Sequence, residues 1–75
     1  MHLPKAIEIN PDIMMGKPCI RGTRIPVYIV LQKFAEGETI EQIMNDYPQL
    51  QQHHILACLQ YAAGLASEEI ALSLQ

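Results

Sequence analysis

The chain has little positive charge and no tryptophan. Lysine and arginine account for 5 of its 75 residues and aspartate and glutamate for 8, so the formal net charge at pH 7 is −3. Every cationic residue lies at or before Lys33, and the acidic residues that follow have no basic neighbour in the sequence. This balance argues against a nonspecific binder of polyanions, although the early part of the chain could still meet one.

Long apolar runs and export signals are also lacking. No run approaches the roughly 18 apolar residues that a membrane span requires, and no charged segment followed by an apolar stretch opens the chain. The two cysteines, Cys19 and Cys58, form no CxxC pair. Because 49% of the residues are hydrophobic, disorder is not expected either. We expect a single small domain covering residues 1–75, located in the cytoplasm and without membrane contact.

Catalytic and metal-binding patterns are missing as well. No nucleophile has an evident base and orienting acid, and no carboxylate pair stands in a catalytic setting. Residues 16–17 match part of a phosphate-binding loop, but Pro11 and Pro18 stand where that motif needs a glycine and a hydroxyl residue. His54 and Cys58 share one helical face, yet a zinc site needs more ligands. We expect a protein that is not an enzyme, with no cofactor, metal or small-molecule substrate.

What the chain does have is the stretch GKPCIRGTRIPV at residues 16–27, which holds three of its five cationic residues. We predict a small hairpin here, preceded by a short strand at residues 7–9. Gly22 supplies the positive φ of the turn, while Gly16 and Pro26 help to fix the shape of the hairpin. Since a proline marks each edge, we expect an edge ribbon.

The hairpin cations Lys17, Arg21 and Arg24 have two possible roles. They could contact DNA phosphates or an acidic protein partner, or they could lie in a solvated turn and pair with Glu8 or Asp12. The spacing of the residues leaves both interpretations open. On the first interpretation, neutralising Arg21 and Arg24 together should weaken binding and leave thermal stability nearly unchanged.

Helical periodicity starts directly after Pro26, which suits the first position of a helix that Gly37 then ends. Thr39 and Gln42 form a capping box at the start of a second helix. The Tyr-Pro pair at residues 47–48 stops that helix, because the residue before a proline avoids the helical region.

A third helix is predicted to begin near Gln51 and to end at Gly64. Ser67 then offers an N-cap for a last turn or two over residues 70–74. These boundaries divide the single domain into a β-hairpin arm (1–26), a trihelical core (27–64) and a C-terminal short helix or tail (65–75).

The expected fold class is therefore mainly α, with short N-terminal β-strands followed by a three-helix core whose second and third helices form a helix-turn-helix. In such a unit the start of the third helix enters the major groove of DNA. The residues at that position are Gln49, Gln51, Gln52 and His53. Glutamine can pair with adenine, but no arginine or lysine is present there.

The chain resembles a small bacterial family known as domain of unknown function 433. The resemblance is carried by GKPCIRGTRIPV together with Ile7, Asn10-Pro11, Ala35-Glu36-Gly37, Ile43, Tyr47-Pro48, Leu50, Ile55, Ala57, Leu59 and Tyr61-Ala62. It implies a homeodomain-like trihelical fold and a role like that of VapB-type antitoxins, which are often paired with a PIN-like nuclease toxin. At the start of the third helix the chain departs from the family's threonine cap and acidic residues.

These observations lead to two hypotheses. The first is an antitoxin-like component of a type II toxin–antitoxin system, which binds a toxin protein and could also bind double-stranded operator DNA. The second is a homo-oligomeric interaction adaptor that does not bind DNA. In both cases the small core and the surplus of apolar residues favour a two-fold homodimer, for which we expect the hairpin to form part of the interface.

Overall fold

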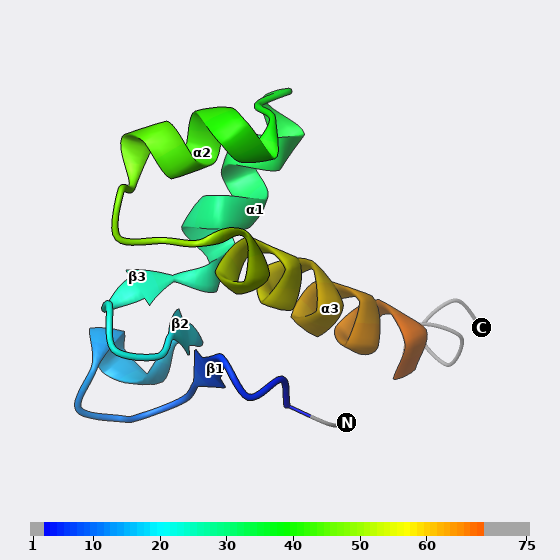
Figure 1. Cartoon of the computed structure of the whole chain (residues 1–75). Helices are drawn as coiled ribbons and strands as arrows, with labels where there is room; N and C mark the ends of the chain where they lie inside the picture. The colour runs from blue at the N-terminus through cyan, green and yellow to red at the C-terminus, as the bar shows by residue number, and fades with distance from the viewer. Residues whose placement is uncertain (1–2, 69–75) are drawn as a thin grey trace.

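The computed structural model describes residues 3–68 and shows a small N-terminal sheet next to three helices (Figure 1). This arrangement confirms the predicted fold class. The elements are β1 (Ile7–Glu8), a turn at Met14–Gly16, β2 (Cys19–Ile20), β3 (Ile25–Pro26), α1 (Val27–Ala35), α2 (Ile40–Asp46) and α3 (Gln52–Glu68).

The sheet is antiparallel with the strand order β1-β2-β3, so the predicted edge position is correct for β3 and wrong for β2, which is the central strand. Ile7 lies opposite Ile20, and Ile20 lies opposite Ile25. Pro18 does not prevent this arrangement because it stands just before β2. Its carbonyl oxygen accepts a hydrogen bond from the Val27 N–H at 2.9 Å, and no donor is required of it.

Helix α1 begins after Pro26, one residue later than predicted, and Pro26 serves as its N-cap. The helix ends in a Schellman motif, in which the Glu38 N–H donates to the Lys33 carbonyl at 3.0 Å and the Gly37 N–H to the Phe34 carbonyl at 2.9 Å. Gly37 has φ +92°, which only glycine adopts without strain, and this confirms the predicted stop.

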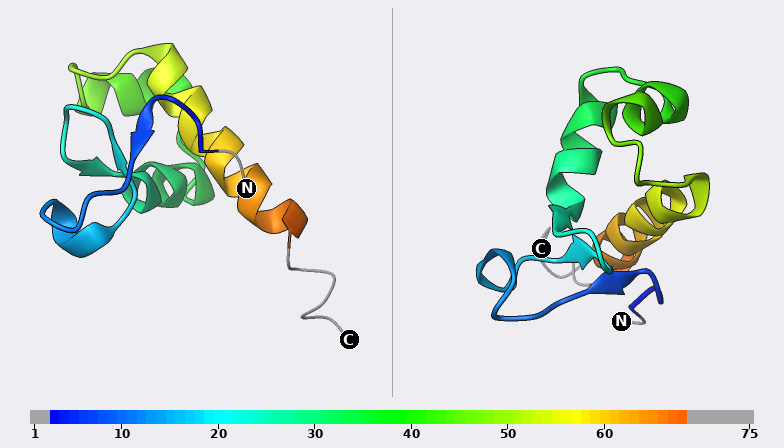
Figure 2. Two further views of the ribbon diagram at one scale, coloured as in Figure 1. Left: turned by 90° about the horizontal axis from the view of Figure 1, so that it is seen from below. Right: turned by 60° about the vertical axis from the view of Figure 1, so that its left-hand side comes forward.

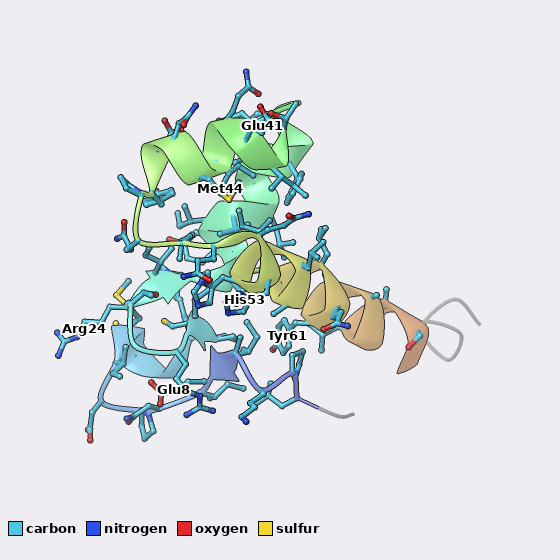
Figure 3. The ribbon with its side chains drawn as sticks, viewed as in Figure 1. Glu8, Arg24, Glu41, Met44, His53 and Tyr61 are labelled. Carbon is cyan, nitrogen blue, oxygen red and sulfur yellow. The ribbon has the colours of Figure 1, made fainter. Side chains whose placement is uncertain are left out.

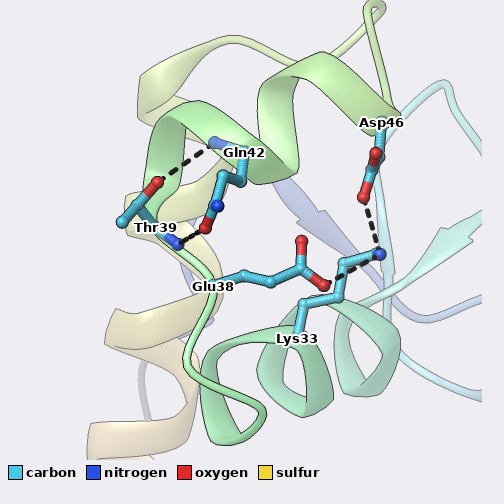
Figure 4. A network of polar contacts seen from close by, with 5 residues as sticks. All are labelled: Lys33, Glu38, Thr39, Gln42 and Asp46. Carbon is cyan, nitrogen blue, oxygen red and sulfur yellow. Dashed lines mark hydrogen bonds and ion pairs between the residues drawn. The ribbon is translucent and has the colours of Figure 1, made fainter.

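Helix α2 has the capping box that the sequence predicts (Figure 4). The Gln42 N–H donates to Thr39 Oγ1 at 3.2 Å, and the Thr39 N–H donates to Gln42 Oε1 at 2.8 Å. Tyr47 leaves the helical region at the far end, as expected for a residue before proline.

Helix α3 is longer than predicted, because it continues through Gly64 to Glu68. The predicted stop at Gly64 and the N-cap role of Ser67 are therefore wrong. A single glycine costs a helix only about 1 kcal/mol relative to alanine, and the neighbouring alanines and leucine favour continuation. The Ser67 hydroxyl donates to the Gly64 carbonyl at 3.0 Å within the helix. The final turn predicted over residues 70–74 lies outside the described residues.

The core lies where the sheet meets α1 and α3, with α2 closing the side away from the strands (Figures 1 and 2). Among the described residues, no helix is long and apolar enough to span a membrane. The buried core cluster consists of Ile7, Ile20, Ile25, Val27, Val30, Ile43, Leu50, Ile55, Ala57 and Cys58.

Candidate partner-binding surfaces

Arg21 is engaged within the fold. Its Nε donates to the Lys5 carbonyl at 3.0 Å, and a terminal nitrogen donates to the Ile7 carbonyl at 3.3 Å. The other terminal nitrogen pairs with Glu8 at 3.1 Å. The guanidinium thus wraps the outer edge of β1, and of the two interpretations of the hairpin cations, pairing with a local carboxylate holds for this one.

Arg24 behaves differently from Arg21. It has φ +62°, a left-handed conformation that is costly for a residue with a Cβ. Its side chain is exposed and points away from the body of the molecule (Figure 3). Within residues 3–68 its guanidinium makes no hydrogen bond or ion pair, so its charge is available to a partner.

Lys17 makes a different kind of contact from either arginine. Its Nζ is 5.0 Å from the centre of the Tyr28 ring, at the first turn of α1. A cation over an aromatic face is attracted by the ring, and the contact fixes the direction of the lysine. The hairpin cations therefore differ in their contacts: Arg21 pairs within the fold and Lys17 lies over an aromatic ring.

The predicted turn residues have the backbone that the turns require. Gly22 has φ +80° with open space where a Cβ would stand, and Gly16 has φ +84°. Met14 and Met15, at φ +50° and +57°, share this left-handed turn with Gly16, although their residue type does not predict a positive φ. The strained turn leaves Met15 93% exposed.

The start of α3 presents an uncharged polar edge. Gln49, Gln51, Gln52 and His53 are all exposed there, as the helix-turn-helix hypothesis requires. The helix start is capped by a contact that was not expected: the Gln51 N–H donates to Nδ1 of His54 at 2.9 Å. Desolvation, and secondarily the charge of His53, hold the pKa of His54 below its usual value.

The surface of α2 beside this edge is acidic. Lys33 Nζ pairs with Asp46 at 2.8 Å and with Glu38 at 3.4 Å, so the nearby lysine is engaged by carboxylates (Figure 4). The hydrogen bond to Asp46 raises the pKa of Lys33, and the same bond lowers the pKa of Asp46. The positive charge of Lys33 is therefore engaged by carboxylates and is not offered to a phosphate.

A solvent-open groove of about 380 Å³ lies between α1 and α3. Its apolar side chains fall at helical spacing in each helix. We call it the α1–α3 groove; its lining residues are Lys17, Pro18, Val27, Tyr28, Leu31, Tyr61 and Leu65.

The two cysteines are free, buried thiols. In the described ranges, no cluster of three or more histidine, cysteine, aspartate or glutamate side chains could hold a metal ion. Burial raises the pKa of the Cys58 thiol to about 11, as expected for a cysteine that packs as a small apolar side chain.

Comparisons with known proteins identify a family and a fold. A family model described as "Protein of unknown function (DUF433)" matches residues 7–62. The chain is 40% identical over 56 residues to the uncharacterized protein y4eO of Sinorhizobium fredii (strain NBRC 101917 / NGR234). That match covers 75% of this chain but only 25% of y4eO, so the chain spans about a quarter of the length of this relative.

The fold is similar to that of a solved protein. The crystal structure of a DUF433 member from Anabaena variabilis superimposes with a TM-score of 0.78 at 26% identity. The alignment covers 97% of this chain and 72% of the Anabaena protein. The similarity therefore extends over the hairpin and all three helices.

Proposed function

The chain belongs to the DUF433 family, and from that premise we propose that it is an antitoxin-like protein, which binds a partner protein and catalyses no reaction. The resemblance supplies the antitoxin role. The structure supplies a surface suited to it, namely the end of the β2–β3 hairpin.

The observation that carries the proposal is the conformation of Arg24 and the exposure of its side chain. A strained left-handed backbone holds this exposed guanidinium away from the body of the protein, without a hydrogen bond or ion pair among residues 3–68. Strain of this kind is typical of residues that contact a ligand or partner. An arginine fork matches carboxylates well, and carboxylates line the active sites of the metal-dependent nucleases to which such a toxin would belong.

Rescue of growth tests this proposal. The chain is co-expressed with the nuclease-like product of an adjacent reading frame, and neutralisation is read as restored growth. Arg24→Gln should lose rescue, whereas the matched control Lys5→Gln, another exposed cation of the arm, should retain it. Equal rescue by both variants would exclude Arg24 as the contact, and a wild-type chain that fails to rescue would contradict the antitoxin role.

DNA binding is the second candidate activity, and the observation in its favour is the exposed polar edge at the start of α3. The residues Gln49, Gln51, Gln52 and His53 are accessible for base contacts. However, phosphate contacts supply most of the affinity of DNA-binding proteins, and the neighbouring α2 surface is acidic. This balance argues against operator binding and leaves the proposed binding of a partner protein unaffected.

Mobility-shift titration at low salt tests whether the chain binds operator DNA. We expect no preference for the chain's own promoter over random duplex DNA. A specific shift that weakens as salt rises, and that is lost in the double variant Gln51→Ala/Gln52→Ala, would restore the DNA-binding half of the hypothesis.

A further inference from the structure

The loop between β1 and β2, residues 9–18, gathers exposed apolar side chains. Ile9 is 51% exposed, Met14 44% and Met15 93%, and no other large apolar side chain among the described residues is as exposed as Met15. The loop stands at the opposite end of the molecule from the C-terminal end of α3 (Figures 1 and 2). Small solutes therefore have open access to the thioether sulfur of Met15.

The backbone of this loop is strained where the methionines stand. Met14, Met15 and Gly16 have φ values of +50°, +57° and +84° in succession. Two hydrogen bonds hold the turn, from the Gly16 N–H to the Ile13 carbonyl at 3.0 Å and from the Lys17 N–H to the Met14 carbonyl at 3.1 Å. Glycine fits this backbone without strain, so the folding of the turn does not account for two thioethers. Strained residues of this kind cluster at functional sites.

The other sulfur atoms of the described chain are less accessible. Met44 in α2 is partly buried and packs against the core cluster. Cys19 and Cys58 are buried, and desolvation raises the pKa of both thiols, so little of the reactive thiolate is present near neutral pH. Oxidants of sulfur act on thioethers and thiolates, and among residues 3–68 the thioether of Met15 is the most open to them.

We propose that Met15 is a modification site, at which a peroxide oxidises the thioether to the sulfoxide. With hydrogen peroxide, a lone pair of the sulfur forms a bond to one oxygen atom while the O–O bond breaks. The departing oxygen takes the proton from the transferred one and leaves as water. The sulfur is thus oxidised by two electrons and the peroxide is reduced.

Oxidation of Met15 changes the surface of the protein and not its core. A sulfoxide is polar where the thioether is apolar. Because Met15 is 93% exposed, the added oxygen enters water and displaces no packed side chain. The same oxygen on Met44 would enter the packing around the core cluster. The β1–β2 loop therefore loses its most exposed apolar group while the protein stays folded.

Peptide mass spectrometry during exposure to dilute hydrogen peroxide tests the site. At about pH 6 the thiols are protonated, and fragment ions separate Met14 from Met15. Met15 should be oxidised at least about fivefold faster than Met44 in the folded protein, with Met14 slower than Met15, and the rates should converge in urea. In the control Met15→Leu the fast reaction should disappear, and the rate at Met44 should not change.

The stability of the modified protein gives a second measurement. Protein in which Met15 is oxidised and Met44 is intact should keep its urea midpoint to within about 0.2 M. A clearly lower midpoint would overturn the proposal, because the side chain would then contribute to the fold. Equal rates at Met15 and Met44 in the folded protein would overturn it as well, and so would a fast reaction that persists at Met14 in Met15→Leu.

Discussion

At the scale of single residues, Arg21 and Arg24 belong to one hairpin and have opposite roles. Arg21 bonds to two backbone carbonyls and to Glu8, although its side chain is 56% exposed. Arg24 makes none of these contacts. We predict that Arg21→Gln lowers the free energy of unfolding by about 1 to 2 kcal/mol through lost hydrogen bonds, whereas Arg24→Gln changes it by less than about 0.5 kcal/mol.

Urea denaturation of the two single variants measures this difference. A double substitution would hide it, because both effects would appear together. If Arg21→Gln unfolds at the wild-type urea concentration, the wrap around β1 contributes nothing and Arg21 is free to serve a partner.

Gly22 provides a case in which the backbone alone sets the cost. A Cβ there would meet no atom within 4 Å, so only its φ of +80° opposes substitution. Gly22→Val should lower the free energy of unfolding by roughly 1 to 3 kcal/mol, and Gly22→Asn by clearly less, since asparagine tolerates the left-handed region. Equal losses for the two variants in thermal melts would show that the turn relaxes to a different φ.

The residue types predicted the turns, but they left open whether each arginine pairs with a local carboxylate or faces a partner. Gly22 and Gly37 are read directly from local sequence, because a positive φ is a property of one residue. The Arg21 contacts depend on the register between β1 and β2, which joins residues 13 to 16 positions apart. A short alternating strand does not specify that register strongly, so the partner of Arg21 could not be read from its spacing.

At the scale of elements, α2 and α3 share one contact at their starts, a backbone N–H that donates to the side chain three residues later, but the accepting groups differ in chemistry. In α2 the Gln42 side chain accepts the Thr39 N–H, and in α3 the His54 ring accepts the Gln51 N–H. An amide oxygen accepts at any pH. A histidine nitrogen accepts only while it carries no proton, so the cap of α3 depends on pH.

We predict that the stability of α3 falls in mild acid. The pKa of His54 in the folded protein lies below its usual value near 6.5, so the unfolded chain takes up the proton first. The stabilising contribution is complete above about pH 6.5 and is lost as the pH falls through the lower pKa of the folded state. Urea midpoints measured from pH 7.5 down to pH 5 should decrease.

His54→Gln is the matched control, because it copies the pH-independent cap of α2. Its urea midpoint should decrease less than that of the wild type over the same range, while both should be similar at pH 7.5. Parallel curves would show that other groups cause the acid dependence. His53→Gln, which leaves the cap in place, should retain most of the wild-type slope.

Local sequence signals predicted the boundaries of α1 and α2 better than the end of α3. The end of α1 and both ends of α2 are marked by glycine, a capping box and proline, which act within one turn of the chain. Gly64 gives a similar signal, but the apolar stripe of α3 continues beyond it and Leu65 reaches the groove. The packing of α3 against α1 decides there, and a window of sequence does not contain it.

At the scale of the whole molecule, the two buried thiols lie in different parts of the fold. Cys58 belongs to the central cluster that joins the sheet to the helices, whereas Cys19 is buried beside that cluster and its thiol donates to the Lys17 carbonyl at 3.3 Å. Desolvation raises the pKa of both thiols, with Glu8 adding to the effect at Cys19. Both side chains are buried, so a reagent reaches neither thiol without an opening of the structure. The raised pKa also slows the reaction, because the thiolate is the nucleophile.

The reaction rates of the two thiols therefore show whether the part of the fold around Cys19 opens separately from the helices or only together with them. Around Cys19 lie two-residue strands and a strained turn, features of regions that open at low cost, while exposing Cys58 requires the helices to separate. Under native conditions at pH 8, iodoacetamide should label Cys19 at least about tenfold faster than Cys58, as measured by peptide mass spectrometry over time. Near the urea midpoint, where global unfolding dominates, the two rates should converge. Equal rates in the absence of urea would contradict this prediction and would show that the hairpin arm and the three helices open only together.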